Sequence, residues 1–68
     1  MVEKIYVDSS NIEAVGYDNE QLHVWFTSGG YYIYSDVPRH VFDDLINASS
    51  KGSFLNREVK GVYQFAKQ

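Results

Sequence analysis

The residues best suited to chemistry lie in the last third of the chain, where cations gather around the predicted start of a helix. Lys51, Gly52 and Ser53 lead into that helix, whose first backbone amides point outward with partial positive charge. Arg57 and Lys60 follow along it. Lysine beside such amides suits a phosphate or carboxylate, so we predict that these five residues form an anion site. The alternative is that Ser53 only caps the helix and Lys51 is solvated.

Charge is distributed unevenly along the chain. The net charge of −3 at pH 7 argues against generic nucleic-acid binding. Residues 1–48 carry two cations and eight acids, a charge of −6, whereas residues 49–68 carry four cations and one acid, a charge of +3. Any anion-binding surface is therefore expected in the last third. An ordinary solvated surface is the alternative.

A second set of candidates is aromatic, since Phe, Trp and Tyr make up 16% of the residues. Trp25, Tyr32, Tyr34 and Tyr63 could form a stacking platform for bases, as aromatic strand residues do in proteins that bind single strands. For Tyr32 and Tyr34 we favour core packing instead, because a small domain needs the buried area. Trp25 is the better surface candidate, and beside Ile33 it would equally suit a protein partner or a second copy.

Other chemistry has little support. The chain has no cysteine and only two histidines. His40 and Asp44 are one helical turn apart, which is half of a metal site, but no third ligand follows at a suitable spacing. Nucleophile, phosphate-loop and dinucleotide motifs are absent. We therefore predict a protein that is not an enzyme and that uses no metal and no cofactor.

The 68 residues are expected to form one domain, because neither a linker nor an internal repeat is present. No apolar run approaches the roughly 20 residues needed to span a bilayer, and the first residues lack the apolar stretch of a leader. We expect a cytoplasmic protein that does not enter the membrane.

Strands are predicted over residues 11–17, 21–27 and 31–35, where apolar and polar residues alternate. In the first strand, Ile12 and Ala14 should share one face and Val15 the other. Turns are expected at 18–20 and 28–30, and residues 5–7 either add a short edge strand or stay loose.

The register of the second hairpin decides which aromatic residues are buried. A two- or four-residue loop would place Tyr32 and Tyr34 beside His23 and Trp25 on the outer face. A three-residue loop with a bulge would place them beside Leu22, Val24 and Phe26 instead. We favour the bulged form.

Two helices complete the prediction. The first runs from Pro38 to about Ala48 with Asp36 as its cap, and its apolar stripe should cover one face of the sheet. The second is capped by Ser53 and ends near Lys60, and residues 62–65 return to the sheet as an extended segment. The predicted fold is α+β: a three-stranded antiparallel meander packed against one main helix, with a short second helix and a C-terminal extended segment.

Five motifs occur together in order along residues 8–65, and together they resemble the KTSC domain. They are Ser9-Ser10-x-Ile12, Gly16-Tyr17-Asp18, Leu22-x-Val24-x-Phe26, Gly29-Gly30-x-Tyr32-x-Tyr34-x-x-Val37-Pro38 and Ser50-Lys51-Gly52-x-x-x-Asn56. This family is a short module at the C-terminus of some lysyl-tRNA synthetases and also a stand-alone protein in bacteria and phages. Its place on a synthetase implies RNA binding. Trp25 and Ile33 depart from the basic strand residues that would suit RNA.

Two functions are therefore expected. The first is a non-catalytic module that binds RNA or another phosphate-bearing ligand through the basic C-terminal third. The alternative is a protein-interaction or homo-oligomerising module that uses the outer sheet face around Trp25. In that case it would modulate a host factor or hold a small nucleotide between subunits.

Overall fold

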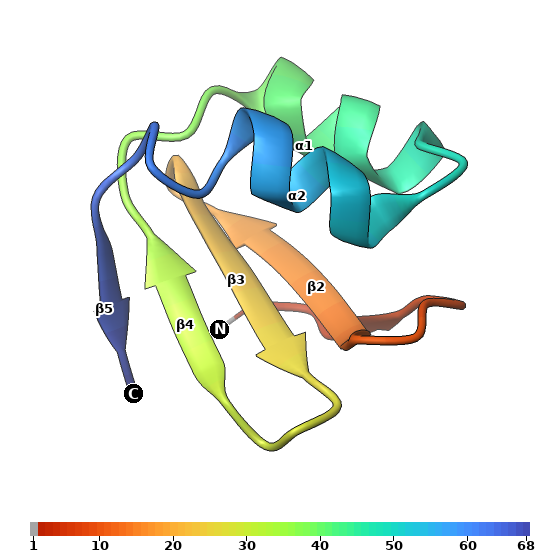
Figure 1. The fold of residues 1–68 in the computed structure, drawn as a ribbon. Coiled ribbons are helices and arrows are strands. Elements are labelled where there is room, and N and C mark those ends of the chain that lie inside the picture. Colours follow the sequence, from red (N-terminus) through yellow and green to blue (C-terminus); the bar gives the residue numbers. More distant parts are fainter. Residues whose placement is uncertain (1) are drawn as a thin grey trace.

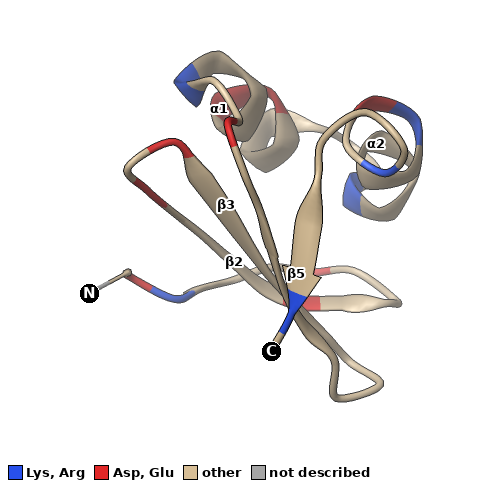
Figure 2. Ribbon diagram, turned by 90° about the vertical axis from the view of Figure 1, so that its left-hand side faces the viewer, with Lys and Arg blue, Asp and Glu red and all other residues tan. Residues whose placement is uncertain are grey.

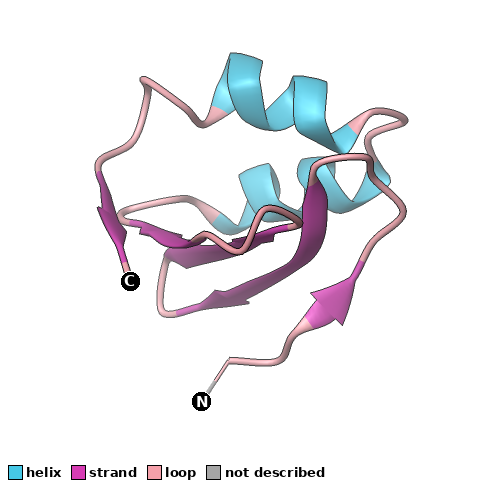
Figure 3. Cartoon of the chain, turned by 60° about the horizontal axis from the view of Figure 1, so that its bottom comes forward, coloured by secondary structure: helices cyan, strands magenta, loops and turns pink. Residues whose placement is uncertain are grey.

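A computed structural model describes residues 2–68 as a five-stranded antiparallel sheet with two helices on one of its faces (Figures 1 and 3). The strands pair in the order in which they occur in the chain. The elements are β1 (Ile5–Tyr6), β2 (Ile12–Asp18), β3 (Gln21–Phe26), β4 (Tyr31–Tyr34), α1 (Arg39–Asn47), α2 (Lys51–Glu58) and β5 (Phe65–Lys67). Neither of these helices is long and apolar enough to span a membrane.

The α+β class and the central β2–β3–β4 meander are confirmed, but the sheet is wider than predicted. At one edge Ile5 pairs with Val15 of β2, which resolves the open question about residues 5–7. At the other edge Tyr34 of β4 pairs with Phe65. The extended segment predicted over 62–65 is thus a paired strand that begins at Phe65. Three residues without clear alternation are too few to be recognised as a strand from sequence.

A β-bulge in β2 overturns the predicted faces of that strand. The register with β3 shifts between Ile12 and Ala14, so Glu13 has no partner residue in β3. Beyond the bulge the alternation is reversed. Ile12 and Val15 consequently share the helix-covered core, and Ala14 lies on the other face.

The β3–β4 register follows the bulged alternative. Tyr34 lies opposite Leu22 and Tyr32 lies opposite Val24, so both tyrosines point toward the helices. The loop comprises residues 27–29, one position earlier than predicted, because the Phe26 N–H donates to the Gly30 carbonyl at a distance of 2.8 Å. Gly29 adopts a φ of 103°, which a residue with a side chain rarely tolerates.

Both helix starts differ from the prediction. Helix α1 begins after Pro38 with no side-chain cap, and Asp36 instead occupies a turn with a φ of 59°. Helix α2 begins at Lys51, and its cap lies three residues earlier than the predicted Ser53. Ser50 is its cap, and its hydroxyl accepts from the Ser53 N–H at 3.4 Å. Two serines three residues apart offered the same capping chemistry, and the earlier one caps the helix.

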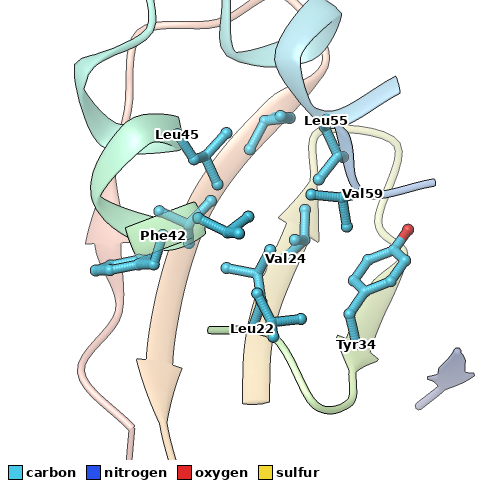
Figure 4. Close-up of a cluster of buried hydrophobic side chains, with 11 residues drawn as sticks. Leu22, Val24, Tyr34, Phe42, Leu45, Leu55 and Val59 are labelled. Atoms are coloured by element: carbon cyan, nitrogen blue, oxygen red, sulfur yellow. The ribbon is translucent and has the colours of Figure 1, made fainter. Parts of the chain in front are cut away.

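The core lies between the sheet and both helices (Figure 4). Tyr17 packs at the edge of this core. The centre of its ring lies 5.3 Å from that of Phe42, and its hydroxyl donates to the Val37 carbonyl at 2.6 Å. Burial raises the pKa of Tyr17, and the nearby charge of Glu20 raises it further to a smaller extent. The hydroxyl therefore stays protonated and remains a donor. The buried cluster comprises Ile12, Val15, Leu22, Val24, Tyr34, Val37, Val41, Phe42, Leu45, Leu55 and Val59.

Candidate functional site

A hollow of about 630 Å³ opens between the β3–β4 loop, the end of α2 and strand β5. We call it the aromatic hollow. Its volume lies within the range of small-molecule sites, roughly 300–1,000 Å³. It is lined by Phe26, Ser28, Gly29, Gly30, Tyr32, Tyr34, Lys60, Gly61, Phe65 and Lys67.

Two lysines give the aromatic hollow a positive charge. The ammonium of Lys60 lies 5.2 Å from the centre of the Phe26 ring, and that of Lys67 lies 6.0 Å from the centre of the Tyr32 ring. No carboxylate lines the hollow, and within residues 2–68 neither lysine forms an ion pair. Figure 2 shows basic residues on α2 and β5, and acidic residues at the β2–β3 turn. The hollow therefore suits an anion although the whole chain is acidic.

Three aromatic rings meet where β4 pairs with β5. The Phe65 ring lies 5.3 Å from that of Tyr32 and 5.6 Å from that of Tyr34, tilted by 44° and 45°. Burial raises the pKa of Tyr34, as does neighbouring Tyr32 to a smaller extent, so its hydroxyl stays protonated at neutral pH. The hollow thus combines ring faces, two cations and a neutral hydroxyl.

A second hollow, of about 480 Å³, lies at the start of α2 and is polar. The Lys51 ammonium donates to the Ala48 carbonyl at 3.1 Å, so it is turned back onto the chain. A Cβ on Gly52 would stand 2.6 Å from the Asn11 side-chain oxygen, so glycine permits this close approach. This polar hollow is lined by Asp8, Ser9, Ser10, Asn11, Ser49, Ser50, Lys51, Gly52, Ser53 and Asn56.

The five residues of the predicted anion site are not brought together. Lys51, Gly52 and Ser53 line the polar hollow, whereas Lys60 lines the aromatic hollow. Arg57 lines neither, and it pairs with Glu58 at 3.0 Å. The basic last third therefore presents two separate places for a ligand.

The four aromatic candidates also divide between surfaces. Tyr32 and Tyr34 line the aromatic hollow, and Tyr34 is part of the core as well. Tyr63 packs against the core from the segment between α2 and β5. Trp25 lies on the opposite face of the sheet, where it stacks on Tyr31 at 4.7 Å. The four side chains therefore do not form one platform.

Of the ten residues that line the aromatic hollow, sequence reasoning named Tyr32, Tyr34 and Lys60 and missed the other seven, among them Phe26, Phe65 and Lys67. The alternation in its strand places Phe26 on the inward face but does not indicate a ligand. Phe65 and Lys67 stand two apart and so share a face of β5, and that spacing is the available signal. The predicted extended segment ends at Phe65, so it does not include Lys67.

The outer face of the sheet is partly covered by the N-terminal strap, which we define as residues 2–4. A Cβ on Gly16 would lie 2.6 Å from the Glu3 carbonyl oxygen, so the strap runs directly over this glycine. Lys4 lies over the Trp25 ring at 5.2 Å and pairs with Glu13 at 3.4 Å. Trp25 is consequently less accessible to a protein partner than the sequence analysis predicted.

His23 lies on this outer face, as predicted, but it is 7% exposed. Its Nδ1 lies 2.8 Å from the Tyr31 hydroxyl oxygen, and its ring stacks against Trp25. Burial lowers the pKa of His23, and Asp18 raises it to a smaller extent. The neutral form is therefore favoured in the folded chain.

We expect the stability of the domain to fall as the pH is lowered because of His23. Its pKa is lower in the folded than in the unfolded chain, so below about pH 6.5 the unfolded state binds more protons. The stabilisation is complete above pH 6.5 and is lost as the pH falls toward the folded pKa. One proton limits the slope to about 1.4 kcal/mol per pH unit.

Urea unfolding between pH 7.5 and 5 measures this loss. His23→Gln should flatten the profile, whereas His40→Gln, at an exposed position, should leave it unchanged. An identical slope in wild type and His23→Gln would contradict the assignment.

The motifs at the two hollows are those of a family. The KTSC domain model matches residues 8–63, which include the whole polar hollow and most of the residues of the aromatic hollow. The chain belongs to the KTSC domain family. Among the described residues 2–68, no group of three His, Cys, Asp or Glu side chains is placed to hold a metal ion.

Several other proteins are similar to this chain. The crystal structure of a KTSC domain protein from Yersinia pestis is 33% identical, with a TM-score of 0.97 over 100% of this chain and 99% of that one. A protein of Tsukamurella paurometabola is 52% identical over 56 residues, which cover 79% of this chain and 84% of that protein. A lysine–tRNA ligase of Nostoc punctiforme is 38% identical over 60 residues, covering 85% of this chain but 11% of the ligase.

Proposed function

We propose that this KTSC domain is a non-catalytic module that binds RNA through the aromatic hollow. The observation that carries the proposal is the position of Lys60 and Lys67, two cations without acidic partners in residues 2–68, beside the rings of Phe26 and Tyr32. Lysines attract the phosphates of a strand, and aromatic faces stack on its bases. Both kinds of contact are available within one hollow.

Two further observations support RNA over other phosphate-bearing ligands. The ring faces add stacking that inorganic phosphate alone would not use. In addition, a lysine–tRNA ligase carries a similar domain, and tRNA is the partner in that protein's name. Joined to such an enzyme, a small module with weak affinity would raise the local concentration of its RNA.

Replacing Lys60 and Lys67 by alanine is expected to weaken RNA binding about tenfold, because both phosphate contacts are lost. The measurement is the fluorescence anisotropy of a fluorescein-labelled single-stranded RNA at several salt concentrations. For the wild type, log K should fall against log salt with a slope of about −1.4, the value for two neutralised phosphates on a single strand. The double variant should lose most of that dependence.

Lys51→Ala is the control, because it removes one lysine charge from the polar hollow and leaves the aromatic hollow intact. Affinity is expected to change less than twofold, since the Lys51 ammonium already bonds the Ala48 carbonyl. If Lys51→Ala abolished binding and the double variant did not, the ligand would belong to the polar hollow. Light scattering on the same samples reports mass, and a dimer without RNA affinity would favour the interaction module instead.

A further inference from the structure

We infer that the aromatic hollow holds one unpaired nucleobase, whose edge is hydrogen-bonded by the Tyr34 hydroxyl while Lys60 and Lys67 hold the adjoining phosphates. This inference rests on the proposed RNA binding and adds the part of the ligand that is recognised. It assigns Tyr34 a specificity role in addition to its place in the core.

The Tyr34 side chain is the first observation. It is only 2% exposed, yet its hydroxyl makes no hydrogen bond to any of residues 2–68. No fully buried side-chain oxygen or nitrogen in these residues lacks a partner, so the hydroxyl must reach the surface of the hollow that Tyr34 lines. Figure 4 shows it at the outer edge of the core cluster, turned away from Leu22.

A hydroxyl that opens into the hollow and has no partner within residues 2–68 is available to a ligand atom. A ligand that covers it must supply a hydrogen-bond partner, because leaving a buried polar group unpaired costs free energy. Tyrosine can donate or accept, and its raised pKa keeps the proton in place. The edge of a nucleobase offers both donors and acceptors.

The surrounding rings supply the second observation. Phe65 is 58% exposed, although it adjoins the rings of both Tyr32 and Tyr34. Its open face is therefore free to stack on a flat ligand while its other side rests on the domain. Alanine substitution of an aromatic side chain that stacks on one base typically weakens binding about five- to 150-fold.

Size and charge complete the match. The 630 Å³ hollow lies within the range of small-molecule sites, which suits one nucleotide. Bases inside a duplex present only their edges, so the stacking face would be accessible in single strands alone. The lysines stand on different elements, Lys60 after α2 and Lys67 in β5, which suits phosphates on either side of a base.

The test uses the whole chain and two labelled RNA octamers that differ only in their bases. One carries uridine or adenosine throughout, and the other carries the same backbone with every base removed. Wild type is expected to bind the base-bearing octamer at least about tenfold more tightly. Tyr34→Phe should weaken that binding about three- to tenfold without affecting the abasic octamer. Its melting temperature should not change, because the lost hydroxyl has no partner within residues 2–68.

Two results would overturn the inference. Equal affinity for both octamers would mean that only phosphate is bound, and RNA binding by charge would then stand without base recognition. Unchanged affinity of Tyr34→Phe for the base-bearing octamer would remove Tyr34 from the site. By contrast, failure of wild type to bind either octamer at low salt would refute the proposed function itself.

Discussion

Leu45→Ala is expected to destabilise the domain by about 2–5 kcal/mol, the usual range for a buried leucine. Leu45 is fully buried, and it lies on α1 where that helix packs on the sheet beside α2. A domain of 68 residues has a total stability of about 3–10 kcal/mol. This one substitution should therefore remove a large share of the total stability, and a fraction of the molecules should be unfolded at 37 °C.

Urea unfolding followed by circular dichroism measures the loss. Val62→Ala is the control, because Val62 is 60% exposed and should cost less than about 0.5 kcal/mol. If Leu45→Ala is too unstable to purify, Leu45→Met keeps most of the volume and should cost less than about 1.5 kcal/mol. A stability loss below about 1 kcal/mol in Leu45→Ala would contradict the packing of α1 on the sheet.

Gly16→Ala is expected to cost about 1–3 kcal/mol although it adds only a methyl group. The new Cβ would lie 2.6 Å from the Glu3 carbonyl oxygen and 2.7 Å from a Val2 methyl carbon, closer than such atoms approach. The N-terminal strap must then lift from the sheet. Lys4 would move away from Trp25, the only tryptophan, and its fluorescence should shift toward longer wavelengths.

Removal of residues 1–4 tests whether contact with the strap causes this loss of stability. In the shortened chain the obstacle is gone, and Gly16→Ala should stabilise by about 0.4–1 kcal/mol, because alanine loses less backbone entropy on folding. The sign of the effect therefore reverses between the two chains. A cost of equal size in both would show that the methyl group clashes with something other than the strap.

The sequence patterns predicted the middle of the fold well. The spacing of Leu22, Val24, Tyr32 and Tyr34 around a glycine-rich turn allowed two registers, and the need of a small domain for buried area selected the correct one. The turn at Asn19 and Glu20 was also recognisable, because Asp and Asn are common in tight hairpins, and both turn residues have positive φ.

Features that depend on tertiary context were not predictable in the same way. The bulge after Ile12 exchanges the faces of β2, and nothing in a run of alternating residues indicates an extra one. Ser50 and Ser53 are equally good caps by type, so only the position of the helix distinguishes them.

The candidate site was predicted in composition rather than in place. Basic residues of the C-terminal third do lie beside the tyrosines of β4. The residues that do so are Lys60 and Lys67, not Lys51 and Arg57. The hollow forms because β5 pairs with β4 and carries Phe65 and Lys67 to its rim. A three-residue edge strand has too little pattern to reveal that pairing.

The sequential order of the strands has a kinetic consequence. Every ladder except β4–β5 joins strands that are close along the chain, so most contacts in the sheet are local and its centre should fold fast. During synthesis the N-terminal parts of a chain emerge first. The three hairpin strands and both helices therefore precede β5, which must dock to bring Phe65 and Lys67 to the rim. A nascent domain would thus acquire its hydrophobic core before it acquires the hollow, and the proposed RNA affinity would be the last property to appear.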